Sequence, residues 1–530
     1  MNQIELLIGL LIVVAGLAVV AKRIALPYPV LLVVSGLALG FVPGLPSVKL
    51  DPEIVFFFLL PPLLYPAALF TSWRDFRADL RPILLLAVGL VLVTTVVVAI
   101  VAHAFGGLPW AAAFALGAIV SPPDAVAATA ITTRLRVPRR IITILEGESL
   151  VNDATALVAY RFAVAAAMTG SFSIADAGVR FLAVAIAGVV VGLAIGWIAS
   201  HVQRRMDDPP VQITISLLTP FAAYMTAERL HVSGVLAVVA AGLFLGWRSP
   251  QILSSRTRLN AQVFWEMVVF LLNGLVFVLI GLQLPGILER LSGQSLAALL
   301  MHGVLLSAAV IVVRILWVFP AAYLPRLLIP SLRLRDPYPG WRNVTVVAWT
   351  GMRGVVSLAA ALSIPLTLSN GSPFPGRDFI LFVTFCIIFA TLVLQGLSLP
   401  ALIRALGVVD DGVAELEERT ARTKANEAAL AYLNELEGGT EFPPELLDRA
   451  RAGYHDRLRQ LEVCGLCAEN GEGRSVPLFE RLEQAALTVE RRTIIQLRDE
   501  YVINDEVLRR IQRDLDLAEA RLRGHGPDPE

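Results

Sequence analysis

Residues 119–125 read Ile-Val-Ser-Pro-Pro-Asp-Ala and interrupt an apolar segment that is otherwise long enough to cross a membrane. Pro122 and Pro123 lack an N–H group, and their rings clash with carbonyl groups one turn earlier, so the helix should break here. Ser121 is a suitable N-cap, Pro122 suits the first helical position, and Asp124 then falls in the first turn. A simple proline kink is the alternative, but it leaves a carboxylate in the membrane unexplained. We predict a half-helix whose end faces a cavity rather than lipid.

A second stretch, residues 145–157, reads Leu-Glu-Gly-Glu-Ser-Leu-Val-Asn-Asp-Ala-Thr-Ala-Leu and carries three carboxylates into an apolar segment. The carboxylates are those of Glu146, Glu148 and Asp153. A carboxylate at the bilayer centre costs roughly 2.5–3.5 kcal/mol, so its default interpretation is an ion or proton site. On a helix, Ser149 shares a face with Asn152 and Asp153, which follow three and four residues later. Hydroxyl, amide and carboxylate oxygens together are ligands for hard cations, and the carboxylate also takes a proton.

The composition indicates a polytopic helical membrane protein. Of the 530 residues, 56% are hydrophobic and 17% are charged, which excludes an ordinary soluble domain. Apolar segments near membrane length alternate with short polar loops, and about 13 transmembrane helices result. Their centres fall near residues 12, 35, 60, 92, 121, 153, 190, 219, 239, 273, 309, 354 and 391. The net charge of zero offers no argument for a nucleic-acid partner, and three cysteines form no disulfide framework.

The distribution of basic residues predicts the orientation. Loops after odd-numbered spans contain most of the arginines, for example Arg134, Arg136, Arg139 and Arg140 after the fifth span. The positive-inside rule places these loops and the C-terminus in the cytoplasm and the N-terminus outside. The first span lacks a basic leader and a small-residue cleavage site, so we expect it to be retained. A composition rich in Ala, Leu, Val, Arg and Pro suits a bacterium, and the expected location is its inner membrane.

The chain divides into a transmembrane domain, residues 1–407, and a polar tail, residues 408–530. The tail contains no apolar run of membrane length, and its apolar residues recur at helical spacing, as in Leu478, Leu482, Ala485 and Val489. We predict a cytoplasmic helical tail, either a solvated bundle or dimer contact or a regulatory sensor. Cys464 and Cys467 have metal-pair spacing, but only His455 lies near them, so reduced thiols without a metal are expected.

A second interruption is predicted in the twelfth span, at residues 348–357. Gly351 and Gly354 loosen the helix around Arg353, whose charge inside the membrane requires an anionic partner. The two broken spans are the fifth of spans 1–6 and the fifth of spans 8–13. Interrupted helices at corresponding positions of two halves indicate two inverted repeats and a secondary transporter with a midplane site.

Four motifs resemble the electroneutral branch of the cation:proton antiporters, which includes bacterial NhaP-type and animal sodium/proton exchangers. They are Phe-Phe-Leu-Leu-Pro-Pro-Leu-Leu-Tyr at 57–65, Ser-Pro-Pro-Asp-Ala-Val at 121–126, Glu-Gly-Glu-Ser-Leu-Val-Asn-Asp-Ala-Thr at 146–155 and Gly-Met-Arg-Gly-Val-Val-Ser-Leu at 351–358. The likeness extends over residues 1–405, and the Asn-Asp pair within its Glu-Gly-Glu-Ser context is specific.

The resemblance implies roles for individual residues. Asp153 would bind the cation and the proton in competition, Asp124 and Ser149 would line the same site, and Asn152 would hold it. Glu148 would form an ion pair with Arg353. The resemblance also implies a homodimer in which a six-helix core moves against a dimerisation domain.

Two departures from the family pattern affect the expected site. Pro123 stands where a threonine is usual before Asp124, and Ala125 stands where a proline usually follows. Pro66 stands where many members have a glutamate after the aromatic residue of the third span. The first change removes a hydroxyl ligand, although freed carbonyl groups can substitute, and the second removes an acidic group from the access route.

We therefore expect a secondary active antiporter that exchanges Na⁺, with Li⁺ also possible, for H⁺ by alternating access. A neutral Asn152 in place of a second carboxylate favours one charge exchanged for one. K⁺/H⁺ or broad-specificity exchange is the variant within this class, and an ion channel or a membrane-embedded enzyme are the alternatives from other classes. No Walker motif is present, so ATP-driven transport is not expected, and neither enzymatic activity nor a cofactor is predicted.

Three further charges lie within predicted spans. Arg314 and Glu266 could line a transport pathway, and Arg161, two turns beyond Asp153, could be an internal ion-pair partner. Charged residues in membranes usually pair inside the bundle, and this is the expectation for all three.

Overall fold

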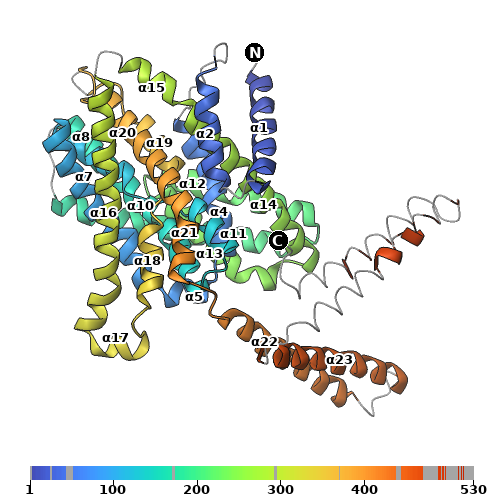
Figure 1. Cartoon of the computed structure of the whole chain (residues 1–530). Coiled ribbons are helices and arrows are strands. Elements are labelled where there is room, and N and C mark those ends of the chain that lie inside the picture. The colour runs from blue at the N-terminus through green and yellow to red at the C-terminus, as the bar shows by residue number, and fades with distance from the viewer. Residues whose placement is uncertain are drawn as a thin grey trace. The chain divides into compact units, whose positions relative to one another are not determined.

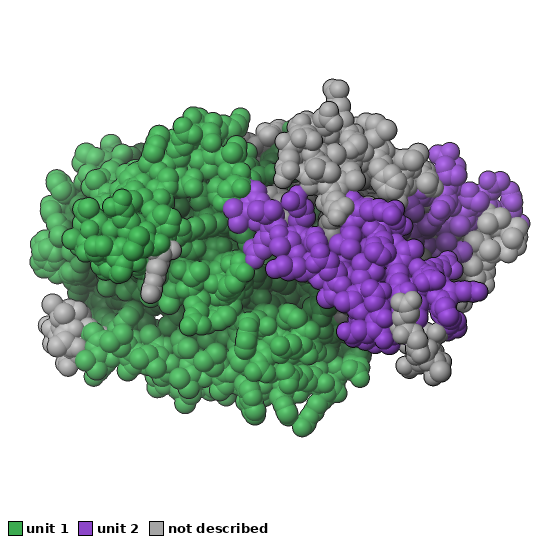
Figure 2. Space-filling model, turned by 90° about the horizontal axis from the view of Figure 1, so that it is seen from below, with its two compact units in different colours: residues 1–411 green, residues 412–530 purple. Residues whose placement is uncertain are grey.

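The structure is a computed structural model that describes residues 3–23, 27–42, 52–169, 174–291, 295–368, 371–436 and 443–469, and residues 487–490, 492–494, 496, 500, 511, 515 and 517–518. It divides into two compact units, residues 1–411 and residues 412–530 (Figure 2). The division falls close to the predicted change of composition after Gly407, where α21 ends with a glycine in the left-handed conformation.

The first unit is built from helices (Figure 1). In its first half these are α1 (Gln3–Arg23), α2 (Tyr28–Gly40), α3 (Pro52–Ile54), the π-helix η1 (Val55–Leu59), α4 (Leu60–Phe70), α5 (Trp73–Ala78), α6 (Leu80–Leu84), the π-helix η2 (Leu85–Leu90), α7 (Val91–Gly106), α8 (Trp110–Val120), α9 (Ala125–Arg134) and α10 (Arg139–Thr169). The second half comprises α11 (Ile174–Gln203), α12 (Pro209–Arg229), α13 (Gly234–Ile252), α14 (Ser255–Leu282), α15 (Leu284–Arg290), α16 (Leu296–Leu328), α17 (Pro330–Arg335), α18 (Trp341–Trp349), α19 (Val355–Leu362), α20 (Arg377–Ala390), the π-helix η3 (Thr391–Gln395) and α21 (Gly396–Leu406).

The predicted all-α membrane fold is confirmed. Among the described residues, eight helices are long and apolar enough to cross a membrane, and three shorter apolar helices cover residues 8–21, 28–40 and 55–70. The two remaining predicted spans coincide with α12 and with the pair α18 and α19. Over the same described residues, β structure is limited to an isolated bridge between Thr367 and Pro373.

The transmembrane helices pack in two groups. We call α1, α2, α4, α11, α12, α13 and α14 the first bundle, because α2 packs along α14, and α13 packs along α4, α11 and α12. We call α7, α8, α9, α10, α16, α18, α19 and α20 the second bundle, in which α8 packs against α7 and α10, and α16 packs against α7, α18 and α20. In Figure 1, α7 and α8 lie on one side of this unit and α1 and α2 on the other.

Small residues allow helices of the first bundle to approach closely. A Cβ atom on Gly36 of α2 would lie 2.3 Å from the carbonyl oxygen of Val278 on α14, so these backbones are in direct contact. Close backbone contact between membrane helices increases van der Waals attraction, which drives their association in a solvent as apolar as the side chains.

The second unit contains α22 (Val413–Glu435) and α23 (Pro444–Glu469), which pack against each other. Leu430 and Leu447 are buried, and the Arg451 guanidinium donates to the carbonyl oxygen of Leu433. Cys464 and Cys467 fall on α23, and their side chains lie outside the described residues, as do Leu478, Leu482 and Ala485. The predicted functions of the tail and its cysteine pair stay predictions.

Candidate functional site

Both predicted interruptions occur as gaps between helices, and the two gaps touch. α8 ends at Val120 and α9 begins at Ala125, whereas α18 ends at Trp349 and α19 begins at Val355. The backbone N–H of Asp124 donates to the carbonyl oxygen of Met352 at 2.7 Å. A hydrogen bond between the gaps satisfies backbone groups that a broken helix leaves without intrahelical partners.

Arg353 stabilises the carbonyl end of α8. Its fully buried guanidinium donates through Nε to the carbonyl oxygen of Val120 at 3.1 Å and through Nη1 to the carbonyl oxygen of Gly351. Its backbone N–H donates to the Thr391 hydroxyl at 3.1 Å. A cation at a helix C-terminus interacts favourably with the partial negative charge of the helix dipole. These contacts explain how the guanidinium is accommodated in the membrane, although no carboxylate among the described residues bonds to it directly.

Asp124, rather than Ser121, is the N-cap of α9, which corrects the predicted capping. One carboxylate oxygen of Asp124 accepts the N–H of Val126 at 2.9 Å, and the hydroxyl of Ser121 donates to the carbonyl oxygen of Ala118. Pro122 and Pro123 therefore both lie outside the helix. Asp124 is the N-cap because its carboxylate is a stronger acceptor than a hydroxyl for the N–H groups at a helix start.

A glycine makes room for the carboxylate of Asp124. A Cβ atom added to Gly354 would lie 1.7 Å from the second carboxylate oxygen of Asp124. The backbone of the second gap therefore touches the side chain that caps the half-helix of the first gap. Gly354 permits this approach because it has no side chain.

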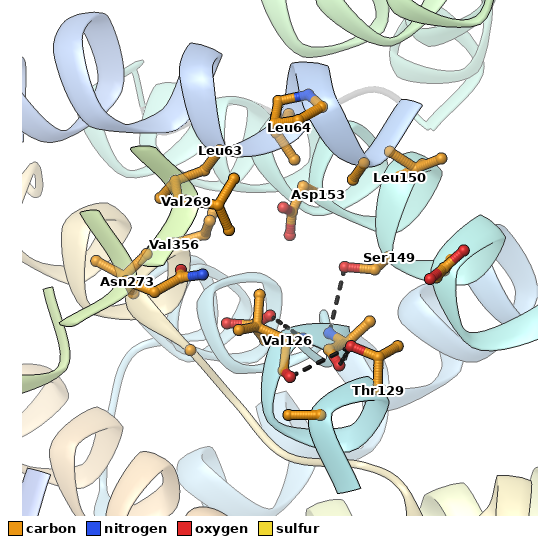
Figure 3. Close-up of a pocket in the computed structure, with 18 of the residues that line it drawn as sticks. Leu63, Leu64, Val126, Thr129, Ser149, Leu150, Asp153, Val269, Asn273 and Val356 are labelled. Carbon is orange, nitrogen blue, oxygen red and sulfur yellow. Dashed lines mark hydrogen bonds between the residues drawn. The ribbon is translucent and has the colours of Figure 1, made fainter. Parts of the chain in front are cut away.

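The face of α10 predicted from sequence points at the first gap. The Asn152 amide donates to the carbonyl oxygen of Pro123 at 2.8 Å. The Ser149 hydroxyl accepts the N–H of Ala125 at 3.4 Å (Figure 3). Pro123, which lacks the usual threonine hydroxyl, thus contributes its carbonyl group to this contact. Asp153, on the same face, is 7% exposed, and its carboxylate has no hydrogen-bond or ion-pair partner among the described residues.

A cavity of about 710 Å³ lies between the two bundles (Figure 3). Its wall from the second bundle includes Asp124, Ser149 and Asp153, and Figure 3 shows the Asp153 carboxylate facing the open space. Its wall from the first bundle comes from α2, α4 and α14 and is mostly apolar. The first-bundle residues are Tyr28, Leu60, Leu63, Leu64, Pro66, Ala67, Phe70, Trp265, Glu266, Val269 and Asn273.

Glu148 pairs with Arg314 and not with Arg353, contrary to the ion pair implied by the family resemblance. Two hydrogen bonds of 2.6 and 2.9 Å join the Arg314 guanidinium to the two carboxylate oxygens of Glu148, and both side chains are buried. Arg314 also donates to the carbonyl oxygen of Val347. The sequence could not indicate which of the two arginines pairs with Glu148, because either provides the cation that a buried carboxylate requires.

The other two charged residues within the predicted spans, Arg161 and Glu266, have different surroundings in the structure. Arg161 forms an ion pair with Glu228 of α12 at 2.9 Å. Glu266 is exposed, accepts a hydrogen bond from Gln262 and lines the cavity. Within the part of the chain that the structure describes, no group of three or more His, Cys, Asp or Glu residues could hold a metal ion.

Sequence reasoning missed several polar residues of the cavity, among them Ser357 and Asn273. Ser357 belongs to the quoted motif at 351–358, and Asn273 is an amide within the apolar sequence of α14. The same rule that singled out Asp153, that polar groups in a membrane span require a reason, could have identified Asn273.

Comparison with known proteins identifies the family. Residues 9–405 match the transmembrane domain of the sodium/hydrogen exchangers. The chain is 36% identical over 528 residues to a protein of Mycobacterium tuberculosis named as an uncharacterized Na⁺/H⁺ exchanger, covering 98% of this chain and 97% of that protein. It is 34% identical over 414 residues to the sodium, potassium, lithium and rubidium/H⁺ antiporter of Bacillus subtilis, covering 76% of this chain and 61% of that protein.

The fold is that of a solved antiporter. The structure of the sodium proton antiporter MjNhaP1 from Methanocaldococcus jannaschii matches with a TM-score of 0.60 at 20% identity, covering 76% of this chain and 98% of that one. These matches confirm the resemblance found in the four sequence motifs, and the chain belongs to the sodium/hydrogen exchanger family of multi-pass membrane antiporters.

Proposed function

We propose that this antiporter binds a monovalent cation and a proton in competition at Asp153. The observation that supports this assignment is a buried carboxylate without an ion-pair partner that lines the cavity between the bundles. Glu148, the neighbouring buried carboxylate of α10, is already neutralised by Arg314. A carboxylate removed from water is stable when it is protonated or paired with a cation, so Asp153 holds one or the other.

Three neighbours of Asp153 complete the proposed site. Ser149 contributes a hydroxyl oxygen, and Asp124 contributes a second carboxylate next to the end of the half-helix. Asn152 keeps the gap in place through its hydrogen bond to Pro123. Oxygen ligands of these kinds match the preference of hard monovalent cations.

Competition for one carboxylate produces coupling. A bound Na⁺ displaces the proton of Asp153, and a returning proton displaces Na⁺. If only the occupied carboxylate permits the transition between inward-facing and outward-facing states, each cation that crosses is exchanged for a proton. Because the residue beside Asp153 is the neutral Asn152, one charge is exchanged for one, and the cycle is electroneutral.

Alternating access follows from the position of the cavity between two bundles. We infer that the second bundle carries the site and moves against the first. The cavity extends to Phe70, Arg134 and Glu146, and the positive-inside rule places that end of the membrane domain in the cytoplasm. This assignment makes the described conformation inward-facing, in a bacterial inner membrane with the N-terminus outside and the tail in the cytoplasm.

The first bundle is the proposed surface for a homodimer. Its helix α11 exposes a row of large apolar side chains, among them Leu182, Ile186, Val190 and Trp197. A static bundle anchored by a second copy gives the second bundle a fixed partner to move against. Chemical cross-linking in membranes tests this assembly.

Na⁺ is the proposed main substrate, with Li⁺ as a second. Exchange of K⁺ or of several alkali cations is the alternative, and it is favoured by the relative from Bacillus subtilis that is named for four cations. The apolar α4 wall of the cavity supports this alternative, because Pro66 contributes no charge there to select a strongly hydrated ion.

The experiment uses the full chain in proteoliposomes that contain a pH-sensitive dye. Na⁺, Li⁺ or K⁺ is added to the wild type, to Asp153→Asn and to the control Asp378→Asn, which removes a carboxylate outside the cavity. Cation-dependent proton movement should be lost in Asp153→Asn and retained in the control. Equal exchange by Asp153→Asn would refute the proposed site, and cation flux that ignores a proton gradient would indicate a channel.

A further inference from the structure

Two of the cavity's polar groups that the proposed exchange site does not use are almost completely buried. The hydroxyl of Ser357 and the amide of Asn273 both line the cavity, and their exposed fractions are 1% and 3%. Neither the Ser357 hydroxyl nor the Nδ2 atom of Asn273 has a partner in hydrogen-bonding geometry among the described residues. A buried polar group without a partner costs roughly 1–3 kcal/mol, so two such groups at one cavity require a physical reason.

Ser357 reaches the cavity from the second gap. It lies in the first turn of α19, three residues after Gly354, whose backbone touches the carboxylate of Asp124. Serine hydroxyls in helices commonly donate to the carbonyl group one turn earlier, as Ser363 does to Ala360 in this chain. Among the described residues Ser357 makes no such bond, so its oxygen is a polar atom without a partner at the cavity wall.

Asn273 reaches the cavity from the opposite wall. It lies on α14 of the first bundle, and Figure 3 shows its amide facing the space in front of Asp153. Its polar neighbour is the Tyr28 hydroxyl. Half a turn of the amide exchanges its nitrogen for its oxygen without a change of shape, so Asn273 can offer either atom to the cavity.

The first-bundle wall offers few other ligands for a cation. The α4 residues on this wall are apolar, and the Trp265 indole N–H already donates to Ser216. Glu266 is exposed and accepts a hydrogen bond from Gln262. Asn273 and the adjacent Tyr28 hydroxyl are therefore the neutral oxygen donors of this wall, and Asn273 is the buried one through which the first bundle can contact an ion held by Asp153.

We propose that Ser357 and Asn273 are additional ligands of the transported cation and determine its selectivity. This inference rests on the proposed function of Asp153. The cation is then held by a carboxylate and a hydroxyl of α10, a hydroxyl of α19 and an amide oxygen of α14. Because α14 belongs to the first bundle, the bound cation connects both bundles in the inward-facing state, and its contact with Asn273 is made and broken during transport.

The test measures apparent KM and Vmax for Na⁺, Li⁺ and K⁺ with the full chain in dye-loaded proteoliposomes. Ser357→Ala and the nearly isosteric Asn273→Leu should each raise the KM for Na⁺ about tenfold, the loss of one interaction with a charged partner, and leave Vmax within about twofold. The ratio of the KM values for Na⁺ and K⁺ should change, and Ser357→Thr should restore the wild-type values because it retains the hydroxyl.

Thr384→Val is the matched control. The Thr384 hydroxyl is also buried and has no hydrogen-bond partner in the described part of the chain, but it does not line the cavity. Its removal should leave every KM unchanged. An equal rise of KM in Thr384→Val would attribute the effect to general packing and would overturn the inference.

A variant that gains affinity covers the case in which Ser357→Ala does not fold. Asn273→Asp keeps the size of the side chain and adds a charge, so it should lower the KM for Na⁺ about tenfold at alkaline pH. Unchanged KM values in Asn273→Asp and Asn273→Leu, with Asp153→Asn inactive, would overturn the role of Asn273 and leave the proposed function intact. Exchange by Asp153→Asn would instead refute the proposed function itself.

Discussion

The carboxylate of Glu148 accepts two hydrogen bonds from the guanidinium of Arg314, at 2.6 and 2.9 Å, with both side chains almost completely buried. The pair joins α10 to α16 and so connects the two halves of the second bundle. Two parallel N–H···O bonds hold both side chains in one orientation, which keeps the neighbouring Asp153 face of α10 in register with the gaps.

Removal of one partner of this pair should be strongly destabilising. Arg314→Met leaves Glu148 as an unpaired buried charge, and the expected loss is about 3–5 kcal/mol. The double variant Arg314→Met with Glu148→Leu should recover much of that loss, since neither charge is then buried alone. Thermal unfolding of the purified protein in detergent measures the loss of stability in both variants. Equal destabilisation by the single and double variants would contradict the role of an unpaired buried charge.

Gly354→Ala should abolish exchange while the helices still form. The added Cβ atom would lie 1.7 Å from the carboxylate of Asp124, so either that side chain or the second gap must move. Gly286→Ala is the matched control, because no atom lies within 4 Å of the position of its Cβ atom. Exchange rates in proteoliposomes distinguish the two variants. Wild-type activity of Gly354→Ala would show that exchange tolerates a displacement of the Asp124 side chain or of the second gap.

The ion pair between Arg161 of α10 and Glu228 of α12 should favour the inward-facing state, because it joins the two bundles at the predicted outer end. Arg161 is half exposed, so the contribution is about 0.2–1 kcal/mol, or up to roughly fivefold in the equilibrium. In a background without the native cysteines, a cysteine replacing Val356 in the cavity should react faster with an external maleimide when Arg161→Gln is added. The exchanged pair Arg161→Glu with Glu228→Arg should restore slow labelling.

Acid should weaken a charge cluster outside the predicted spans. Burial raises the pKa of Asp336, but hydrogen bonds and charge from Arg326 and Arg140 outweigh it and hold the pKa below its usual value. A lowered pKa in the folded state stabilises the protein above the ordinary aspartate pKa, and this contribution disappears as pH falls through the lowered value. Asp336→Asn should therefore lower the melting temperature at pH 7, and the difference from wild type should shrink on acidification.

The residues that break helices were the ones most predictable from sequence, whereas the cap of α9 was not. Proline pairs, glycines flanking an arginine and membrane-length apolar runs act through local sterics and hydration, which do not depend on distant parts of the chain. The gaps at 121–124 and 350–354 follow from that local chemistry. The polar face formed by Ser149, Asn152 and Asp153 follows from helical periodicity alone.

Only the tertiary structure decided which of several equivalent partners each buried charge contacts. The sequence by itself determined that Glu148 needs a cation and that a buried arginine needs acceptors, because burial of either charge alone is costly. The packing of α10 against α16 decided that Arg314 forms the ion pair with Glu148. The contact of the two gaps placed Arg353 where its guanidinium donates to the carbonyl end of α8. The approach of α14 to the second bundle likewise decided that Asn273 and Asp153 line the same cavity, since contacts between segments far apart in the chain depend on how helices pack and not on local periodicity.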